Sequence, residues 1–239
     1  MKESRFITRP IDLFYLRPVE SQVLSHLGNS GRILDLGCGN GAKAESFRRL
    51  GFEAWGIDID PARIKSAQEA FPDCNFVCAS MESLPFPRNS FDAVFSSSTL
   101  QYVGHKLAIA EVNRILKPHG KAVFLENLSR CPLAICYRFM HRLKPYSPHM
   151  TPKGHLDLEA IVELFRPFQS CEITPYNLTT TALIPFLIAH QILARSQTIA
   201  LEPTCLYSAL TWCDKHLLNQ FPPLRKRCWT VMIRAEREL

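Results

Sequence analysis

This sequence has no hydrophobic run long enough to cross a membrane. Its longest apolar stretch, ALIPFLIA at residues 182–189, is soon interrupted by His190 and Arg195. A membrane span needs roughly 20 apolar residues, so this stretch is too short. The first ten residues carry charges and hold no apolar core, so they do not resemble a secretory signal. We therefore expect a cytoplasmic protein with no transmembrane segment, for which peripheral membrane contact stays open.

Closely spaced cysteine pairs are also missing. The nine cysteines are scattered between Cys38 and Cys228, and none form a C-x-x-C pair. Structural zinc sites usually need such pairs, and dispersed thiols stay free in a reducing compartment. We therefore expect free thiols and no metal site.

Neither composition nor charge is extreme. Hydrophobic residues make up 46% and charged residues 21% of the 239 positions, which is ordinary for a globular protein with a substantial core. The net charge of +6 comes partly from the N-terminus and partly from Arg225, Lys226 and Arg227. A solvated surface is the simpler interpretation of this charge, and nucleic-acid binding is the less favoured one.

Short apolar strands alternate with helical patterns as far as residue 126. The alternation is typical of a parallel sheet with helices on both faces. A helical pattern also precedes the first strand, near residues 18–27. We expect strands at 33–36, 53–57, 75–78, 93–96 and 122–125, and helices at about 42–50, 61–71 and 108–116.

After residue 126 the pattern changes to longer helical stretches and two more strands, at 171–176 and 229–235. We therefore expect one domain over 1–239, with a Rossmann-like α/β fold. Its doubly wound, mostly parallel seven-stranded sheet would carry helical insertions that form a cap. The expected parts are an N-terminal helical segment at 1–30, a core at 31–127, and cap insertions at 128–155 and 179–226.

A glycine-rich turn, Gly37-Cys38-Gly39-Asn40-Gly41, follows the first expected strand directly. Glycines allow a sharp turn and a close approach of backbone N–H groups to a ligand. The helix that follows adds unpaired donors and the positive end of its dipole. Asp58, at the end of the second strand, is placed to accept the hydroxyls of a ribose. These features predict an adenosine-containing cofactor and leave the dinucleotides open.

An acid inside the first strand favours a cationic cofactor. Asp35 stands two residues before the first glycine of the turn. Its carboxylate would repel the pyrophosphate of a dinucleotide, whereas it suits a sulfonium and an ammonium group. A structural hydrogen bond at the base of the turn is the alternative role for Asp35.

Four segments resemble class I S-adenosylmethionine-dependent methyltransferases, particularly the small type 11 group. They are ILDLGCGNG at 33–41, GIDID at 56–60, LPFPRNSFDAV at 84–94 and ILKPHGKAVFLE at 115–126. They follow one another in the order of the family over about residues 32–126. The resemblance implies S-adenosyl-L-methionine as the cofactor and methyl transfer as the activity.

The resemblance also implies where the methionine portion of the cofactor lies. Gly37, Gly39 and the neighbouring backbone, including Asn40, would hold it. Asp35 would lie near its ammonium group. Ser96, near the end of the fourth strand, would lie close by.

The resemblance further implies that the adenosine portion of the cofactor lies at the ends of the second and third strands. Asp58 would accept the ribose hydroxyls, and Ile59 would pack on the adenine. Ser80 and Met81 would face the adenine edge. The family often has an acid where Ser80 stands, and a serine accepts a hydrogen bond without charge assistance, so weaker affinity is expected.

The methyl acceptor is less defined. Tyr15, Tyr102 and His105 are candidate pocket residues because such sites open outside the carboxyl ends of the strands. Packing is the alternative role for each of them. The sequence identifies no catalytic base, acceptor atom or oligomeric state.

The apolar cap insertions indicate a small, largely apolar acceptor, such as a lipid, a quinone or a polyketide-like molecule. These helices would alternatively complete the core or form a dimer interface. Three other functions stay open: an NAD-dependent oxidoreductase, an RNA methyltransferase and a non-catalytic cofactor-binding scaffold.

Overall fold

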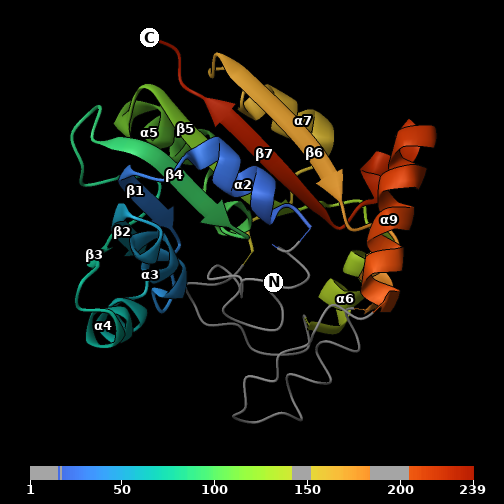
Figure 1. The fold of residues 1–239 in the computed structure, drawn as a ribbon, viewed down its shortest axis with the longest axis horizontal. Coiled ribbons are helices and arrows are strands. Elements are labelled where there is room, and N and C mark those ends of the chain that lie inside the picture. The colour runs from blue at the N-terminus through green and yellow to red at the C-terminus, as the bar shows by residue number, and fades with distance from the viewer. Residues whose placement is uncertain (1–15, 17, 142–151, 184–204) are drawn as a thin grey trace.

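Seven strands form one sheet in the order β3-β2-β1-β4-β5-β7-β6. The structure is a computed structural model that describes residues 16, 18–141, 152–183 and 205–239 (Figure 1). The first five strands pair in parallel, and β7 runs antiparallel to β5 and β6. The mostly parallel, seven-stranded sheet predicted from the sequence is therefore confirmed. The strands are β1 (Gly31–Leu36), β2 (Phe52–Asp58), β3 (Asn75–Cys78), β4 (Phe91–Ser97), β5 (Leu116–Asn127), β6 (Ser170–Tyr176) and β7 (Thr230–Glu236).

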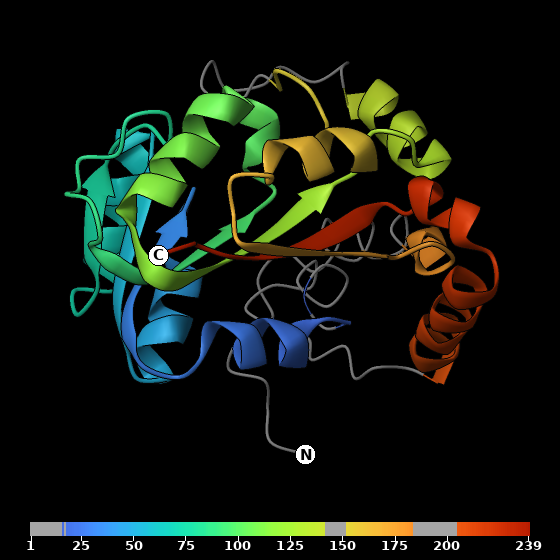
Figure 2. The same ribbon diagram turned by 90° about the horizontal axis from the view of Figure 1, so that it is seen from above.

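Helices cover both faces of the sheet (Figure 2). One face carries α5 (His105–Ile115) and α7 (Leu158–Leu164). The other carries α2 (Glu20–Leu27), α3 (Ala42–Arg49) and α4 (Pro61–Ala70). The result is the three-layer, doubly wound arrangement expected from alternating strands and helices.

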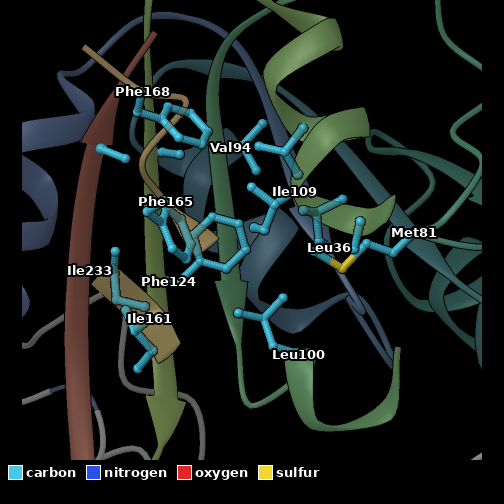
Figure 3. Packing of buried hydrophobic residues seen from close by; sticks show 14 of the residues in the cluster. Leu36, Met81, Val94, Leu100, Ile109, Phe124, Ile161, Phe165, Phe168 and Ile233 are labelled. Carbon is cyan, nitrogen blue, oxygen red and sulfur yellow. The ribbon is translucent and has the colours of Figure 1, made fainter. Parts of the chain in front are cut away.

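Alternate strand residues point to opposite faces, so the sheet has two apolar cores. In β1, Leu34 belongs to the core beneath α5 and α7, whereas Ile33 belongs to the core beneath α2, α3 and α4, where Phe47 is also buried. Figure 3 shows the first core, in which the rings of Phe124 and Phe165 lie with their centroids 5.1 Å apart. Both cores hold the strand ends rigidly in place.

Strand β5 is longer than the 122–125 segment predicted from the sequence. It begins at Leu116, which pairs with Phe91, and its pairing with β4 resumes at Lys121 opposite Ala93. The residues between form an irregular bulge, in which His119 has a positive φ of 60°. A bulge of this kind gives no alternating pattern in the sequence, which is why the strand seemed to start later.

The carboxyl ends of the parallel strands meet at one edge of the sheet. The chain steps from β1 outward to β2 and β3, and later returns to the other side of β1 with β4. This reversal is a topological switch point, and open α/β sheets bind ligands at the strand ends beside it. The glycine turn follows β1 at this position.

Beyond that edge lie α6 (Pro132–His141) and α9 (Cys205–Gln220), at the same end of the molecule in both views (Figures 1 and 2). Short 3-10 helices η3 (Thr180–Leu183) and η4 (Pro222–Arg227) flank α9 in sequence. The expected insertions at 128–155 and 179–226 contain these helices, and part of each insertion lies outside the described residues. Among the described helices, none has the length and apolar character needed to cross a bilayer.

Helix α9 is attached to the sheet through Asp214. This buried carboxylate accepts hydrogen bonds from the backbone N–H groups of Leu178 (3.0 Å) and Thr179 (2.5 Å), just after β6. The Thr180 hydroxyl lies 2.8 Å from the same carboxylate. Buried polar groups need such partners, so these bonds determine where α9 sits.

Candidate functional site

The glycine turn after β1 has left-handed backbone at three positions. Gly37, Gly39 and Gly41 have φ values of 70°, 56° and 82°. A Cβ at Gly37 would lie 2.5 Å from Thr99 Oγ1, and one at Gly41 would lie 2.6 Å from the ring of Phe76. Both positions therefore require glycine on steric as well as conformational grounds.

Gly39 differs from the other two glycines because a Cβ there would clash with no described atom. The nearest described atom to a Cβ at this position is Arg63 Nη1, at 3.9 Å. Asn40, the next residue, is exposed. A ligand can therefore approach the backbone of the turn at Gly39 without a clash, and Gly37 is also exposed.

Asp58, at the end of β2, holds this part of the turn. Its Oδ2 accepts the N–H of Gly39 at 2.9 Å, and its Oδ1 accepts the N–H of Asp60 at 3.0 Å. Each carboxylate oxygen can accept a second hydrogen bond, so both remain usable by a hydroxyl pair. Ile59, the next residue, is 52% exposed, so its side chain is available to pack on a ligand.

Two acids give the turn a negative environment. Asp35 is buried in β1, where it lies in register with Gly56 of β2. Burial is the main reason that the pKa of the Cys38 thiol is raised, and the charges of Asp35 and Asp58 raise it further. Cys38 therefore stays protonated and unreactive. The two acids suit a cationic ligand, and Arg63 Nη1, 4.0 Å from Asp58 Oδ2, offsets part of their charge.

The segment after β3 lies beside Asp58. The N–H of Ala79 donates to the carbonyl of Asp58 at 3.1 Å, which brings Ser80 to the same edge of the sheet. The Ser80 hydroxyl accepts the N–H of Glu82 at 3.1 Å. The Met81 side chain is buried in the core near Leu36 (Figure 3), so any adenine contact at this position would come from its backbone.

Ser96 is fully buried near the end of β4. Its Oγ donates to the carbonyl of Leu36 at 3.5 Å. The side chain therefore links β4 to the last residue of β1. Its predicted position near the methionine portion of a cofactor stays a prediction.

The connection from β4 to α5, residues 98–104, packs on the glycine turn. Thr99 Oγ1 lies 3.2 Å from the Leu36 carbonyl oxygen. The backbone N–H groups of Thr99 and Leu100 both donate to Oε1 of Glu126, at 3.0 and 3.1 Å. Glu126 comes from the end of β5 and is only 4% exposed. We refer to residues 98–104 below as the 98–104 segment.

The other end of the 98–104 segment is bonded to Lys153 and Gly154, which lie in the insertion predicted at 128–155. Glu82 Oε1 accepts the Gly104 N–H at 2.6 Å and the Lys153 ammonium at 2.9 Å. The carbonyl of Gln101 accepts the N–H groups of Lys153 and Gly154, at 2.7 and 3.3 Å. The Gly104 N–H and Lys153 hold the pKa of Glu82 below its usual value.

The predicted acceptor-pocket residues fall on the 98–104 segment or just after it. Tyr102 ends the 3-10 helix η1 (Leu100–Tyr102), and His105 begins α5. Both are partly buried, and His105 Nε2 has no hydrogen-bond partner within the described residues. Tyr15 lies outside the described residues.

Three histidines, His141, His149 and His155, fall in the predicted insertion at 128–155, where a catalytic base could lie, and the structure describes the side chain of His155. Burial lowers the pKa of His155 to about 4, and the nearby Arg138 lowers it further. His155 is therefore neutral at pH 7 but only weakly basic, so it is not assigned as a catalytic base. His141 and His149 have no described side chain.

Sequence reasoning missed the roles of Glu82, Lys153 and Asp214 as anchors around this edge. The sequence does give a signal for Glu126, because this acid stands directly after the apolar run Ala122–Leu125. That signal does not indicate which groups the carboxylate binds. The described residues also contain no group of three potential metal ligands.

The chain is similar in sequence and in fold to known methyltransferases. Residues 34–124 match the family described as a methyltransferase domain. Demethylmenaquinone methyltransferase of Renibacterium salmoninarum is 36% identical over 96 residues, which cover 40% of each chain. Ubiquinone biosynthesis O-methyltransferase of Xanthomonas oryzae pv. oryzae is 35% identical over 150 residues, which cover 57% of this chain and 62% of that protein. The chain therefore matches less than two thirds of the length of these relatives.

The likeness in fold extends over most of the chain. Phosphoethanolamine N-methyltransferase 2 of Haemonchus contortus was solved with S-adenosylhomocysteine and phosphomonomethylethanolamine. It superposes with a TM-score of 0.66 and 17% identity, covering 93% of this chain and 52% of that one. The chain thus contains, in residues 34–124, a type 11 methyltransferase domain, and its fold is that of the class I S-adenosylmethionine-dependent methyltransferases.

Proposed function

We propose that this protein transfers the methyl group of S-adenosylmethionine to a small, largely apolar acceptor. The observation that carries the proposal is the arrangement around Gly39. An open glycine stands beside an acid with spare acceptor capacity, Asp58, and an exposed apolar residue, Ile59. Backbone, ribose and adenine contacts of a nucleoside cofactor match these three groups in that order.

When bound, S-adenosylmethionine supplies an electrophilic methyl group that passes to a nucleophile as S-adenosylhomocysteine leaves. The task of the chain is to hold the two reactants in line, and such positioning alone can supply a large part of the rate. Asp58 would fix the ribose, and Gly37, Gly39 and Asn40 would fix the methionine portion. Asp35 would favour its ammonium group through charge.

The acceptor class is supported by the cap and by the relatives. Leu133, Ile135 and Phe139 of α6 are 48%, 51% and 68% exposed, so this end of the molecule presents apolar surface. The names of the two relatives refer to ubiquinone biosynthesis and to demethylmenaquinone. Among lipids, quinones and polyketide-like molecules, we therefore favour a quinone-type ring as the acceptor.

The first experiment identifies the ligand that purifies with the protein and then measures S-adenosylhomocysteine release with a panel of acceptors. The panel contains quinone-type phenols, phosphoethanolamine and RNA. Release with the phenols alone supports the full proposal. Release with another acceptor keeps the activity and overturns the acceptor class, whereas cofactor binding without any release supports a non-catalytic scaffold.

Substitution of Asp58 tests the cofactor site. Asp58→Ala should weaken S-adenosylmethionine binding by about 1–3 kcal/mol, the scale of a lost hydrogen bond to a charged group. Asp92→Ala is a matched control, because Asp92 also accepts a backbone N–H, that of Arg32 at 2.8 Å, but near the start of β4. Unchanged affinity in folded Asp58→Ala would remove the ribose assignment.

Two alternative functions, an oxidoreductase and an RNA methyltransferase, can be tested separately. Calorimetry that detects NADH binding but no S-adenosylmethionine binding would support an oxidoreductase. An RNA methyltransferase would bind RNA with a steep salt dependence. Lys226, within the basic Arg225–Arg227 stretch, already pairs with Glu159 at 2.5 Å, which leaves less free charge for RNA.

A membrane as the source of the acceptor is the last part of the proposal. The exposed apolar residues of α6 would make this contact, without a spanning segment. Flotation with anionic liposomes tests it. Protein that stays wholly in the soluble fraction rules out peripheral membrane contact and leaves the activity untouched.

A further inference from the structure

Glu126 is a buried acid that the proposed chemistry does not use. It points to the same face of the sheet as Phe124, since the two residues are two apart in β5. Both of its hydrogen bonds fall on Oε1, from the N–H groups of Thr99 and Leu100. Within the described residues Oε2 has no hydrogen-bond partner, so it is the oxygen available to a proton.

Thr99 connects this acid to the glycine turn. Its N–H donates to Glu126, and its Oγ1 lies 3.2 Å from the Leu36 carbonyl oxygen. The same Oγ1 lies 2.5 Å from where a Cβ of Gly37 would be, so the threonine sits directly on the turn. The preceding residue, Ser98, has a positive φ of 57°. A strained conformation of this kind persists only when the surroundings hold it.

The 98–104 segment also reaches the acceptor side of the site. It carries Tyr102, and its Gln101 carbonyl binds the cap at Lys153 and Gly154. Any shift of this segment therefore changes both the glycine turn and the cap contact. The Ser98 N–H donates to the Leu125 carbonyl at 2.8 Å, and Glu126 accepts the next two N–H groups, those of Thr99 and Leu100.

We propose that Glu126 is a positioning residue whose ionised carboxylate holds the 98–104 segment against the glycine turn and thereby favours cofactor binding. The inference rests on the proposed function, since it concerns the same cofactor site. The ionised carboxylate accepts charge-assisted hydrogen bonds, which are roughly twice as strong as neutral ones. Protonation on Oε2 leaves only neutral bonds to Thr99 and Leu100, so the segment is held less tightly.

The Glu126 carboxyl gains and loses its proton within the physiological pH range. Burial raises its pKa to about 7, and the two backbone N–H groups oppose that rise. Charged or titratable groups on the neighbouring elements include Asp35 of β1, Cys38 of the turn, Glu82 after β3, Tyr102 of the segment itself, His105 of α5, Arg138 of α6 and His155. Within the described residues, none of them contributes to the shift.

The expected size of the effect follows from the populations. If the ionised form binds far more tightly than the protonated form, a pKa of about 7 leaves roughly one molecule in eleven in the tightly binding form at pH 6. S-adenosylhomocysteine should then bind about tenfold more weakly at pH 6 than at pH 8. Binding at pH 7 should release about half a proton, because half of the free protein is protonated there.

Titration calorimetry with S-adenosylhomocysteine between pH 6 and pH 8 tests the proposal in three proteins. The wild type should show the tenfold change. Glu126→Gln, which keeps an acceptor oxygen but carries no charge, should bind weakly and equally at every pH. Glu82→Gln is the matched control, since Glu82 anchors Gly104 of the same segment and its pKa is lowered. This variant should bind more weakly at all pH values and keep the wild-type slope.

The outcomes separate this inference from the proposed function. Wild-type affinity that is flat between pH 6 and pH 8, or an unchanged slope in Glu126→Gln, overturns the positioning role and leaves the cofactor assignment standing. Absence of binding at any pH overturns both. If Glu126→Gln fails to fold, the test is the number of protons that the wild type releases on binding, measured by calorimetry in two buffers of different ionisation enthalpy. Zero release at pH 7 overturns the inference.

Discussion

Replacing Glu126 by glutamine should make the protein increasingly more stable relative to the wild type as the pH rises from 5 to 8. The folded state holds the pKa of Glu126 at about 7, against 4.5 for an ordinary glutamate. The raised pKa means that the folded protein binds the proton more tightly than the unfolded chain. The favourable contribution of this tighter proton binding to the free energy of unfolding is therefore fully present below about pH 4.5. It is lost as the pH rises through about 7.

The magnitude follows from the same two values. The difference of 2.5 units (7 − 4.5) corresponds to about 3 kcal/mol that the wild type loses by ionising this side chain in the core. Glutamine carries no charge at any pH, so Glu126→Gln escapes that loss. The difference in unfolding free energy between variant and wild type should grow by about 2–3 kcal/mol from pH 5 to pH 8. A constant offset from the buried amide cancels in this comparison.

Urea unfolding followed by circular dichroism at pH 5, 6, 7 and 8 measures this change. Glu111→Gln is the control, because Glu111 pairs with Arg114 at 2.7 Å and its pKa is lowered. That variant should be less stable than the wild type by a similar amount at every pH in this range. If the Glu126→Gln difference is the same at pH 5 and pH 8, Glu126 titrates as an ordinary carboxyl, and the reasoning from its burial is refuted.

Three further predictions concern the turn, the cap and the thiols. Gly37→Ala should cost about 2 kcal/mol or more of stability in urea unfolding, because it combines a positive φ with a steric clash. Gly39→Ala, whose Cβ would meet no described atom closer than 3.9 Å, should cost about 1 kcal/mol and mainly weaken cofactor binding. Equal stability losses in the two variants would contradict this distinction. Asp214→Ala should lower stability by about 2–4 kcal/mol, because two backbone N–H groups lose their buried acceptor; a loss below 1 kcal/mol would show that water replaces it. Under native conditions, peptide mapping after treatment with iodoacetamide should find exposed Cys78 modified well before buried Cys38, whose pKa is raised, and early modification of Cys38 would contradict its burial.

The sequence by itself determined the strand–turn–helix unit and the fold class. Residues 33–41 are consecutive, and the conformational part of the glycine requirement at Gly37 and Gly41 comes from their own backbone angles. Asp60 and Pro61 likewise predict the start of α4, and the structure confirms it with Asp60 Oδ1 accepting the Ala62 N–H at 2.9 Å. Local patterns of this kind are readable because their causes lie within a few residues.

Only the tertiary structure decided how the acids around the site are used. Glu126 meets Thr99 across 27 positions, Glu82 meets Lys153 across 71, and Asp214 meets Thr179 across 35. No periodicity in the sequence reports contacts over such distances, because they depend on which strands become neighbours and on which side chains lose water. The same holds for the open space at Gly39, which is defined by where distant segments stop and not by the glycine itself.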